Sequence, residues 1–467
     1  MPSGAQETRI DLVIVANRLP IQRRGRRWTL SPGGLVSALR PVLAGSGACW
    51  IGWPGQPDVS MDPLTLDGLT MLPVRLSAAE VAGFYAGMSN GTIWPLFHDR
   101  VRPPEFHRHW WSAYQSVNAR FADMTAENVP PDGLAWIHDY QLSLVPDLLR
   151  RARPDVRVGF FLHIPFPPPQ LFAQLPWRRA FLEGLLGADT VAFQTTYDAA
   201  HFREAAIRYT DARPAGTSLR IAERVVRVQT AAISIDASAF EVEAGLVGTR
   251  ERVEALGESV GRRTVFLGVD RLDYTKGIVT RLRAFDALIE RRNDLAATTV
   301  FVQVCVPSRE SARGYGEARA EIERLIGNIN GRHGQVGRVP IHYRYGTLEH
   351  AELVAHYGAA DIMVVTPPRD GMNLVAKEYV ASRPHGDGVL VLSEFAGAAR
   401  ELRHALRINP FDLDGIADAY EHALSMPLAE QQRRMRRMQA QVRQHDVHAW
   451  ARRALAGIVA EPDRMTP

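Results

Sequence analysis

The sequence predicts an α/β protein made of two Rossmann-like, doubly wound domains. Three observations predict this class. Short apolar runs alternate with helical patterns along the whole chain, most runs are apolar throughout rather than at every second residue, and polar motifs follow several of them directly. Such runs are typical of strands buried on both faces of a parallel sheet, and strand–helix alternation is typical of layered α/β folds. These sheets bind ligands beyond the carboxyl ends of their strands, where the motifs lie.

Each strand is predicted from a short apolar run, and each helix from the pattern that follows it. The strands lie at residues 12–16, 135–138, 157–163, 190–194, 226–235, 265–269, 299–306, 341–345, 362–366 and 389–393. The helices lie at residues 35–43, 142–151, 278–292, 318–329, 373–381 and 445–458. The series restarts after a polar, helix-like stretch, which predicts a first domain at 1–235, a second at 236–445 and a final segment at 446–467.

Composition excludes several classes of protein. Hydrophobic residues make up 46% of the 467 residues and charged residues 23%, so the chain is neither disordered nor fibrous. The net charge of +4 is small for this length and argues against a general nucleic-acid binder, although the pI is about 9.2. Two distant cysteines exclude a disulfide framework and a cysteine zinc site. No signal peptide and no apolar run of about 18 residues is present, so we expect a cytoplasmic protein without a membrane span.

The first motif that carries chemistry follows the strand at 265–269. Arg271 lies just after this strand and Lys276 five residues later, with Gly277 opening a helix. Two cations beside a helix N-terminus form a site for a multiply charged anion; the alternative is a surface loop with ordinary ion pairs. Only two of the 55 basic residues are lysines, Lys276 and Lys377. Lysine in so arginine-rich a chain suggests close quarters, where a compact ammonium fits and a planar guanidinium does not.

The second motif is the segment VVTPPRDGMNLVAKE at residues 364–378. A strand ends, a proline-rich turn follows, and Asn373 is a good N-cap for the next helix. Backbone N–H groups at 371–374 would suit a diphosphate, while Asp370 could accept hydrogen bonds from sugar hydroxyls and Glu378 could hold a ribose diol. The alternative is an ordinary capped helix with an exposed glutamate.

Weaker candidates follow other strands. Glycines before a helix let a backbone approach a phosphate, and tryptophan or tyrosine at a cleft rim stacks on sugar rings as often as it is only packed. The candidates are Arg18 after the first strand, Gly33 and Gly34 before the first helix, Tyr85 and Trp94 flanking a loop at 87–91, Asp139 and His163 at two further strand ends, and Arg309 after the strand at 299–306.

Other chemistries have little support. The chain has no Walker loop, no GxGxxG after a strand, no GxSxG and no HExxH. His107 and His109 are expected to be packed or solvated rather than metal ligands. The arginine-rich run at 23–27 is expected to be a solvated loop, with a flap over an anionic substrate as the alternative.

Taken together, several long segments carry a specific resemblance. They read VIVANRLP, SPGGL, YAGMSNGTIWPLFHD, WIHDYQL, GFFLHIPFP, GVDRLDYTKGI and TPPRDGMNLVAKEYV. From about residue 10 to about residue 450, the chain resembles the trehalose-6-phosphate synthases of glycosyltransferase family 20. The resemblance implies the GT-B fold, in which two Rossmann-like domains enclose an active-site cleft, with the last helix packed back on the first domain.

The resemblance also implies the activity and the roles of the candidate residues. Family members are retaining transferases that move glucose from a nucleoside-diphosphate glucose to glucose 6-phosphate, giving α,α-1,1-linked trehalose 6-phosphate. The implied donor residues are Arg271, Lys276, Asn373 and Leu374 at the diphosphate, Gly33 and Gly34 beside it, Asp370, Gly371 and Met372 at the glucose, Glu378 at the ribose and Leu348 at the nucleobase, with Val375 also in the donor site. The implied acceptor residues are Arg18, Tyr85, Asp139 and Arg309 at glucose 6-phosphate, Trp94 shaping its pocket, and His163 at the transferred sugar.

The implied mechanism uses the leaving diphosphate to help deprotonate the acceptor hydroxyl on the same face of the sugar, since no second carboxylate is placed as a nucleophile. Arg271, Lys276, Asp370 and His163 form the implied catalytic group, and the protein stabilises the diphosphate charge. No metal ion, cofactor, nucleic acid, membrane or appended phosphatase domain is expected. The donor can be UDP-, GDP- or ADP-glucose, and the chain can form a homodimer or homotetramer.

Two alternatives stay open. One is a related transferase with another phosphorylated acceptor, such as glycerol 3-phosphate or a cyclitol phosphate, although the intact acceptor residues favour a hexose phosphate. The other is a catalytically silent paralogue that senses a sugar phosphate. Such a paralogue would be expected to have lost residues such as Arg271, Lys276 or Glu378, and all three are present.

Overall fold

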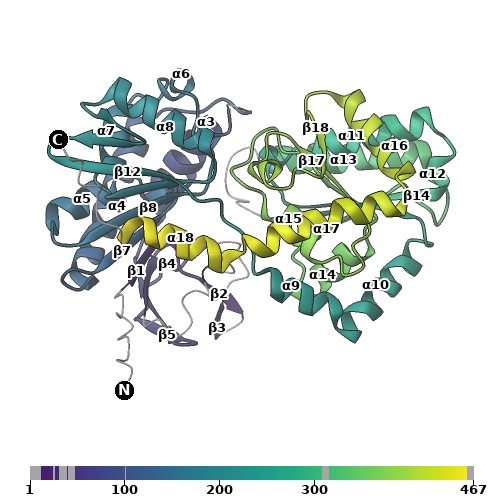
Figure 1. Ribbon diagram of the computed structural model, residues 1–467, viewed down its shortest axis with the longest axis horizontal. Coiled ribbons are helices and arrows are strands. Elements are labelled where there is room, and N and C mark those ends of the chain that lie inside the picture. Colours follow the sequence, from purple (N-terminus) through teal and green to yellow (C-terminus); the bar gives the residue numbers. More distant parts are fainter. Residues whose placement is uncertain are drawn as a thin grey trace. The chain divides into compact units, whose positions relative to one another are not determined.

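The computed structural model describes residues 12–24, 27–30, 39, 48–99, 101–307 and 315–459 of the chain. The chain divides into two compact units (Figure 1). The first comprises Met1–Ala232 with His448–Pro467, and the second comprises Ile233–Val447. Each unit has its own β-sheet with helices packed against it.

The sheet of the second unit has six parallel strands in the order β15-β14-β13-β16-β17-β18. They are β13 (Thr264–Arg271), β14 (Thr299–Val306), β15 (Ile341–Tyr345), β16 (Ile362–Val365), β17 (Val389–Ser393) and β18 (Leu406–Ile408). Counted within the unit, this is the Rossmann order 3-2-1-4-5-6. In that order successive strands are added outward from β13 on one side and outward from β16 on the other. A crevice therefore opens where these two neighbouring strands end.

Helices cover both faces of this sheet, as in a doubly wound fold (Figure 1). They are α9 (Ala237–Gly245), α10 (Val247–Ser259), α11 (Ile278–Arg291), α12 (Leu295–Thr298), α13 (Tyr315–His333), α14 (His350–Ala359), α15 (Leu374–Ala381), α16 (Leu413–Ser425) and α17 (Leu428–Gln444), with short turns η3 (Tyr274–Lys276) and η4 (Gly397–Arg400). On one face α11, α13 and α16 pack around a core that includes Phe266, Phe285 and Phe301. Both faces of β16 and β17 are buried, which is why these strands are apolar throughout.

The sheet of the first unit is larger, but its central parallel strands also reverse their order at one point. Its ten strands run in the order β10-β11-β12-β9-β8-β7-β1-β4-β6-β5, and all are parallel from β12 to β6. They are β1 (Leu12–Arg18), β4 (Cys49–Trp53), β5 (Leu64–Leu66), β6 (Leu69–Pro73), β7 (Leu134–His138), β8 (Arg157–Leu162), β9 (Thr190–Phe193), β10 (Arg213–Ala215), β11 (Ser218–Ile221) and β12 (Arg224–Thr230). The strand order reverses between β1 and β7, so this unit has a second crevice of the same kind.

The helices of the first unit include α18, the last helix of the chain. They are α2 (Ala78–Glu80), η1 (Val81–Ile93), α3 (Trp94–Phe97), α4 (Arg108–Asn128), η2 (Tyr140–Leu142), α5 (Val145–Ala152), α6 (Pro169–Phe172), α7 (Arg178–Leu186), α8 (Thr196–Tyr209) and α18 (Val447–Val459). Trp450 of α18 is fully buried, packs against Trp136 and Phe161, and donates its indole N–H to the carbonyl of Ala231.

Three predicted elements differ from the structure. The strand predicted at 226–235 ends at Thr230, because residues 231–235 leave the sheet toward the second unit. The helix predicted at 142–151 begins only at Val145, after a turn, because Pro146 sits in the first turn, where proline favours a helix start. The run at 23–27 is not a plain loop: β2 (Ile21–Arg24) pairs antiparallel with β3 (Arg27–Leu30). Apart from Leu39, the helix predicted at 35–43 lies outside the described residues.

The loop predicted at 87–91 is also wrong, because these residues form part of η1, a helix with π-type hydrogen bonding. Gly87 and Gly91 suggested a loop, but the structure explains these glycines by side-chain packing. A Cβ on Gly87 would lie 2.5 Å from the indole of Trp110 on α4, and one on Gly91 would lie 3.0 Å from it. The glycines therefore let a large aromatic ring lie directly on the helix backbone.

This packing predicts that Gly87→Ala destabilises the protein. We expect the free energy of unfolding to fall by about 1–3 kcal/mol, since a methyl group at 2.5 Å from the indole forces a shift of the ring or the helix. Gly257→Ala on α10 is the matched control, because a Cβ there meets nothing within 4 Å. Urea unfolding compares the two variants; a Gly87 variant as stable as the Gly257 variant would contradict the packing argument.

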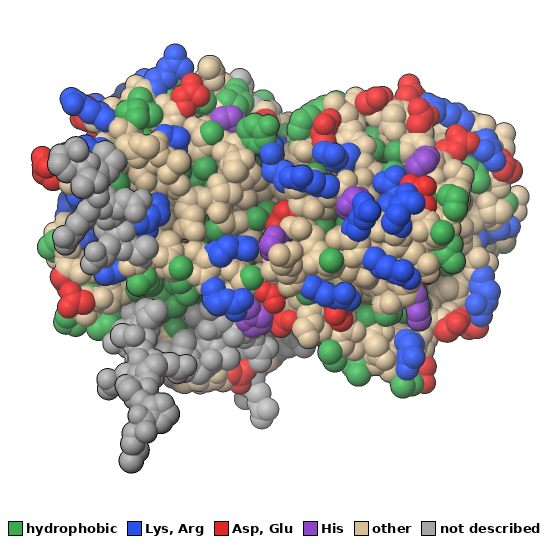
Figure 2. All heavy atoms as spheres, viewed as in Figure 1, with side chains coloured by type: hydrophobic (Ala, Val, Ile, Leu, Met, Phe, Trp, Pro, Cys, Tyr) green, Lys and Arg blue, Asp and Glu red, His purple; other side chains and the backbone are tan. Residues whose placement is uncertain are grey.

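The described surface carries charges of both signs. On the face shown in Figure 2, basic and acidic side chains are interspersed rather than gathered into large areas of one sign. Many arginines are paired, for example Arg292 with Glu421 at 2.6 Å. Within the described part of the chain, no helix combines the length and the apolar character that crossing a membrane requires.

Candidate active site

The candidate residues gather at the two points where the strand order reverses. In the second unit, Arg271 lies at the end of β13 and Asp370 follows β16, the two strands that flank one crevice. In the first unit, Arg18 ends β1 and Asp139 follows β7, the strands that flank the other. Doubly wound sheets bind their ligands at such points, so the position of both clusters follows from topology.

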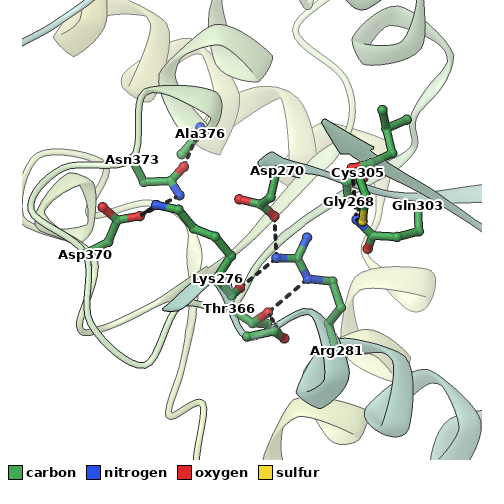
Figure 3. Close-up of polar contacts among 12 residues, drawn as sticks. Gly268, Asp270, Lys276, Arg281, Gln303, Cys305, Thr366, Asp370, Asn373 and Ala376 are labelled. Atoms are coloured by element: carbon green, nitrogen blue, oxygen red, sulfur yellow. Dashed lines mark hydrogen bonds and ion pairs between the residues drawn. The ribbon is translucent and has the colours of Figure 1, made fainter. Parts of the chain in front are cut away.

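Lys276 and Asp370 form the centre of the cluster in the second unit (Figure 3). Lys276 Nζ lies 2.6 Å from Asp370 Oδ2, and both side chains are only 11% exposed. Asn373 donates from Nδ2 to the same carboxylate oxygen at 3.2 Å. One ammonium, one carboxylate and one amide are thus held together at the crevice, a group that can bind both anionic and hydroxyl ligands.

The turn before α11 holds Lys276 in place. Asp273 caps η3 by accepting from the N–H of Thr275 at 3.0 Å. Gly277 has a positive φ of 65°, and a Cβ there would lie 1.9 Å from the carbonyl oxygen of Thr366. Only glycine allows this close approach, which brings the end of the turn against the end of β16.

Arg281 on α11 holds this turn through a hydrogen bond to its backbone. The sequence analysis missed this residue. Its side chain is fully buried, donates to the carbonyl of Lys276 at 2.8 Å, and donates to the Thr366 hydroxyl at 3.1 Å. It also pairs with Asp270 at 2.5 Å (Figure 3). No sequence signal distinguishes it, because it is one basic residue among many in an amphipathic helix.

The N-terminus of α15 lies beside Asp370. Asn373 is the N-cap that the sequence predicts; it has a φ of 78°, and its side chain accepts from the N–H of Ala376 at 3.2 Å. The N–H groups of residues 371–375 donate no hydrogen bond within the described part of the chain. Unpaired N–H groups at a helix N-terminus favour an anion through their partial positive charge. Leu374 and Val375 begin the helix, and Gly371 and Met372 are buried in the turn before it.

Glu378 lies one turn further along α15. It accepts a hydrogen bond from the hydroxyl of Tyr357 at 2.7 Å, and burial raises the pKa of its carboxyl. Tyr357 on α14 is a second residue that the sequence analysis missed. The next residue back, Lys377, is 1% exposed and bonds Glu401 at 2.6 Å and the carbonyl of Ile233 at 2.8 Å, so it belongs to the packing of the unit rather than to a ligand site.

Arg18 and Tyr85 come together in the first unit. The guanidinium of Arg18 lies over the ring of Trp53 at 4.5 Å and over that of Tyr85 at 5.7 Å. Gly55 makes room for it, since a Cβ there would lie 1.7 Å from Arg18 Nη1. The exposed guanidinium is therefore held by aromatic faces and remains able to bind a phosphate. Trp53 is the last residue of β4, a strand that the sequence analysis missed, and Gly55 follows this strand.

Asp139 and His163 meet at the ends of β7 and β8. Asp139 Oδ1 accepts from the backbone N–H of His163 at 3.2 Å, and Asp139 has a positive φ of 74°. Such backbone strain in a residue other than glycine is often found at functional sites. Burial lowers the pKa of His163 to about 3, so its imidazole is neutral near pH 7. His138, the residue before Asp139, contacts the His163 ring at 3.0 Å.

Trp94 is less exposed to solvent than we expect of a residue that lines an acceptor pocket. It is 4% exposed, and its ring packs on His98 at 4.1 Å and on Tyr140 at 5.8 Å. Tyr140 donates to Asn90 at 2.9 Å, and Asn90 donates to the carbonyl of Tyr85 at 2.8 Å. Trp94 therefore lies in the packing that connects η1 to the end of β7, and its role in the pocket stays a prediction.

The other predicted residues fall into two groups. Arg271 is exposed at the end of β13, and Leu348 is half-buried in the segment that follows β15. Gly33, Gly34 and Arg309 lie outside the described residues.

Among the described residues, one group could hold a metal ion: Asp286, Glu290 and His333. Arg332 pairs with both carboxylates, and His333 lies 3.1 Å from Asp286. The guanidinium of Arg332 thus already occupies both carboxylates and offsets one of their two charges. The group lies on α11 and α13 and includes none of the residues predicted for the active site.

His138, which is buried, and His163, which is half-buried, predict a loss of stability in mild acid. Burial lowers the pKa of His138 well below its usual range and that of His163 to about 3. Between about pH 6.5 and about pH 3 the unfolded chain takes up protons that the native state does not. The free energy of unfolding therefore falls as the pH is lowered, by at most about 1.4 kcal/mol per pH unit for each histidine. Urea unfolding across this range should give a shallower dependence for His138→Asn than for the unaltered chain. Equal slopes would contradict this.

Comparison with known proteins places the chain. The model of the family described as Glycosyltransferase family 20 matches residues 10–459. A trehalose-6-phosphate synthase of Mycolicibacterium gilvum is 48% identical in an alignment 471 positions long, which covers 96% of this chain and 94% of that protein. A solved structure of a UDP-forming α,α-trehalose-phosphate synthase from Burkholderia xenovorans, in complex with glucose-6-phosphate, is 35% identical with a TM-score of 0.89 and covers 96% of this chain and 100% of that chain.

A second solved structure, from E. coli and bound with UDP-2-fluoro glucose, is 33% identical with a TM-score of 0.90 and covers 97% of this chain and 100% of that chain. These likenesses confirm the predicted fold class, an α/β protein of the GT-B type with two Rossmann-like domains. The family model and the relatives together cover nearly all of the sequence that carries the motifs. The chain belongs to glycosyltransferase family 20.

Proposed function

We propose that the chain is a retaining glucosyltransferase that moves glucose from a nucleoside-diphosphate glucose to glucose 6-phosphate and releases α,α-trehalose 6-phosphate. One observation carries the proposal: in a chain of this family, Lys276, Asp370 and the N–H groups of residues 371–375, which donate to no described residue, gather at the crevice between β13 and β16. The Mycolicibacterium relative is a trehalose-6-phosphate synthase, and the Burkholderia relative was solved with glucose-6-phosphate.

In this proposal the second unit binds the donor. Lys276, Arg271 and the N-terminus of α15 neutralise the negative charge that develops on the leaving diphosphate, and such stabilisation by preorganised cations and N–H groups is usually the main source of rate enhancement. Asp370 accepts hydrogen bonds from the glucose hydroxyls, and its pairing with Lys276 holds the ammonium toward the sugar–phosphate bond. Glu378 accepts from the ribose hydroxyls with the oxygen that Tyr357 leaves available.

The first unit then binds the acceptor. Arg18 and Arg309 bind the phosphate of glucose 6-phosphate, Arg18 being fixed by the Trp53 and Tyr85 rings. Asp139 accepts from a sugar hydroxyl with its carboxylate, which also accepts from the backbone N–H of His163. Because His163 is neutral, it donates a hydrogen bond to the transferred glucose rather than a proton.

The chemical step transfers glucose on one face of the sugar. The bond from the anomeric carbon to the diphosphate oxygen breaks, the acceptor oxygen bonds the same face, and the acceptor proton moves to the departing diphosphate. No carboxylate nucleophile is used, so the protein acts by holding the two substrates together and by stabilising the diphosphate. The product keeps the α configuration at the transferred carbon.

We also propose UDP-glucose as the donor. The Burkholderia relative is UDP-forming, and the E. coli relative was solved with UDP-2-fluoro glucose. The base would lie against Leu348, in the segment between β15 and α14.

The experiment measures nucleotide release for every combination of donor and acceptor. UDP-, GDP- and ADP-glucose are each combined with glucose 6-phosphate, glycerol 3-phosphate or no acceptor, and the released nucleoside diphosphate is measured. The expected result is fast release only with glucose 6-phosphate, fastest with UDP-glucose. Release that requires glycerol 3-phosphate would move the proposal to another acceptor, and no release with any pair would support a paralogue that binds these ligands without joining them.

A further inference from the structure

His138 and His163 form a pair of hydrogen-bonded imidazoles at the ends of neighbouring strands. His138 is the last residue of β7 and is fully buried, whereas His163 follows β8 and is half-buried. His138 Nδ1 lies 3.0 Å from His163 Nε2, with the ring centroids 5.3 Å apart. One proton is therefore shared between these two nitrogens, and the position of that proton sets the tautomer of both rings.

The surroundings of His138 decide which ring donates. Its second nitrogen, Nε2, is buried and has no hydrogen-bond partner among the described residues. If His163 donated, that nitrogen would carry an N–H without an acceptor. If His138 donates, the nitrogen carries only a lone pair. Buried N–H groups without an acceptor are rarer than buried acceptors without a donor, so the second arrangement is favoured.

The side chains that pack on the two imidazole rings are aromatic. The His138 ring packs on Trp136 at 4.6 Å, and the His163 ring packs on Phe161 at 4.6 Å and faces Trp450 at 6.5 Å. These aromatic groups offer neither ring a competing acceptor. Burial also lowers the pKa of both imidazoles, so neither carries a second proton near pH 7.

Two consecutive residues hold His163 from both sides. Asp139 accepts from its backbone N–H at 3.2 Å, and His138 contacts its side chain. The positive φ of Asp139 lets the chain turn so that both contacts form at once. With Nε2 engaged, His163 Nδ1 is the ring nitrogen left for a ligand, since it bonds no described residue.

We propose that His138 is a positioning residue, which donates from Nδ1 to His163 Nε2 and thereby holds His163 as the tautomer that carries its proton on Nδ1. The inference rests on the proposed function for its consequence: His163 then presents a neutral N–H donor to the transferred glucose. Without His138, the His163 proton can move to Nε2, and the ring offers an acceptor where the sugar needs a donor.

Two variants of His138 separate this role from simple packing. Asparagine can place a side-chain N–H where Nδ1 of histidine lies, whereas leucine fills the space without a donor. We expect His138→Leu to lower kcat about tenfold, the size of one lost hydrogen bond, with KM for glucose 6-phosphate unchanged. His138→Asn should recover most of the loss. Phe161→Leu is the control, because it removes a ring contact and leaves the hydrogen bond.

The direct readout is the tautomer itself, measured by long-range ¹H–¹⁵N correlation on the full chain labelled at its 15 histidines, without substrate. His163 is assigned from the signals lost in His163→Gln. The proposal expects the Nδ1-protonated form in the unaltered chain, in His138→Asn and in Phe161→Leu, and the Nε2-protonated form or a mixture in His138→Leu. An Nε2-protonated His163 in the unaltered chain would overturn it, even if neither His138 variant folded.

The outcomes also separate this inference from the proposed function. The expected tautomers in a chain that transfers no glucose would leave the positioning role standing and remove its catalytic consequence. Normal transfer with an unchanged tautomer in His138→Leu would overturn the positioning role alone.

Discussion

Lys276→Ala is expected to lower kcat by about 10²- to 10³-fold while the chain still folds. Lys276 is the ammonium at the centre of the crevice between β13 and β16, and its Nζ lies 2.6 Å from Asp370. The turn that carries it is held by Arg281 and Thr366 through backbone contacts, which the substitution leaves intact. The loss should therefore appear in turnover of UDP-glucose and glucose 6-phosphate, measured as nucleotide release under saturating substrates.

The other lysine of the chain provides the matched control. Lys377 is buried against Glu401 and the carbonyl of Ile233, so Lys377→Met leaves a carboxylate without its partner. We expect that variant to lose about 3–5 kcal/mol of unfolding free energy, seen as a lower Tm. Lys276→Ala should show a much smaller fall in Tm with a far larger fall in kcat. Near-normal turnover in Lys276→Ala would remove the residue from the mechanism.

Asp370→Ala is expected to lower kcat by about 10²-fold or more, because it removes the acceptor for the glucose hydroxyls and releases two side chains that bond it. Lys276 Nζ and Asn373 Nδ2 both contact its carboxylate, at 2.6 and 3.2 Å. The effect is measured by the same assay at varied donor concentration.

A double-mutant cycle separates catalysis from stability. Each single variant removes one partner of the Lys276–Asp370 ion pair, so the double variant Lys276→Ala/Asp370→Ala should lose less stability than the two single losses added together. Its turnover should stay as low as that of the worse single variant. Recovered turnover in the double variant would mean that the pair matters only for folding and would contradict the catalytic assignment.

The position of the candidate site could be predicted from sequence because it depends on a few general rules. Parallel strands read as continuous apolar runs, and their carboxyl ends lie at one edge of the sheet, so Arg18, Asp139, Arg271 and Asp370 could be placed by counting from the strands. The cap at Asn373 is a local signal and needed no tertiary information.

The rest depends on contacts between distant segments. Gly87 and Gly91 looked like turn residues because nothing near them in sequence points to Trp110, whose indole they accommodate. Strand β4 begins with Cys49 and a glycine interrupts it, so its apolar run is weak, and with it Trp53 was missed. Arg281 is a buried arginine in a helix rich in arginine, and only the packed structure distinguishes it from its exposed neighbours.

The NMR spectrum of the product formed from UDP-glucose and glucose 6-phosphate would show both the acceptor and the stereochemistry of the transfer. We expect a disaccharide monophosphate with two α-anomeric protons and no reducing end, which is the signature of an α,α-1,1 linkage formed with retention. A β-anomeric proton on the transferred glucose, or a product with a free reducing end, would contradict the same-face mechanism and the acceptor geometry built on Arg18 and Asp139.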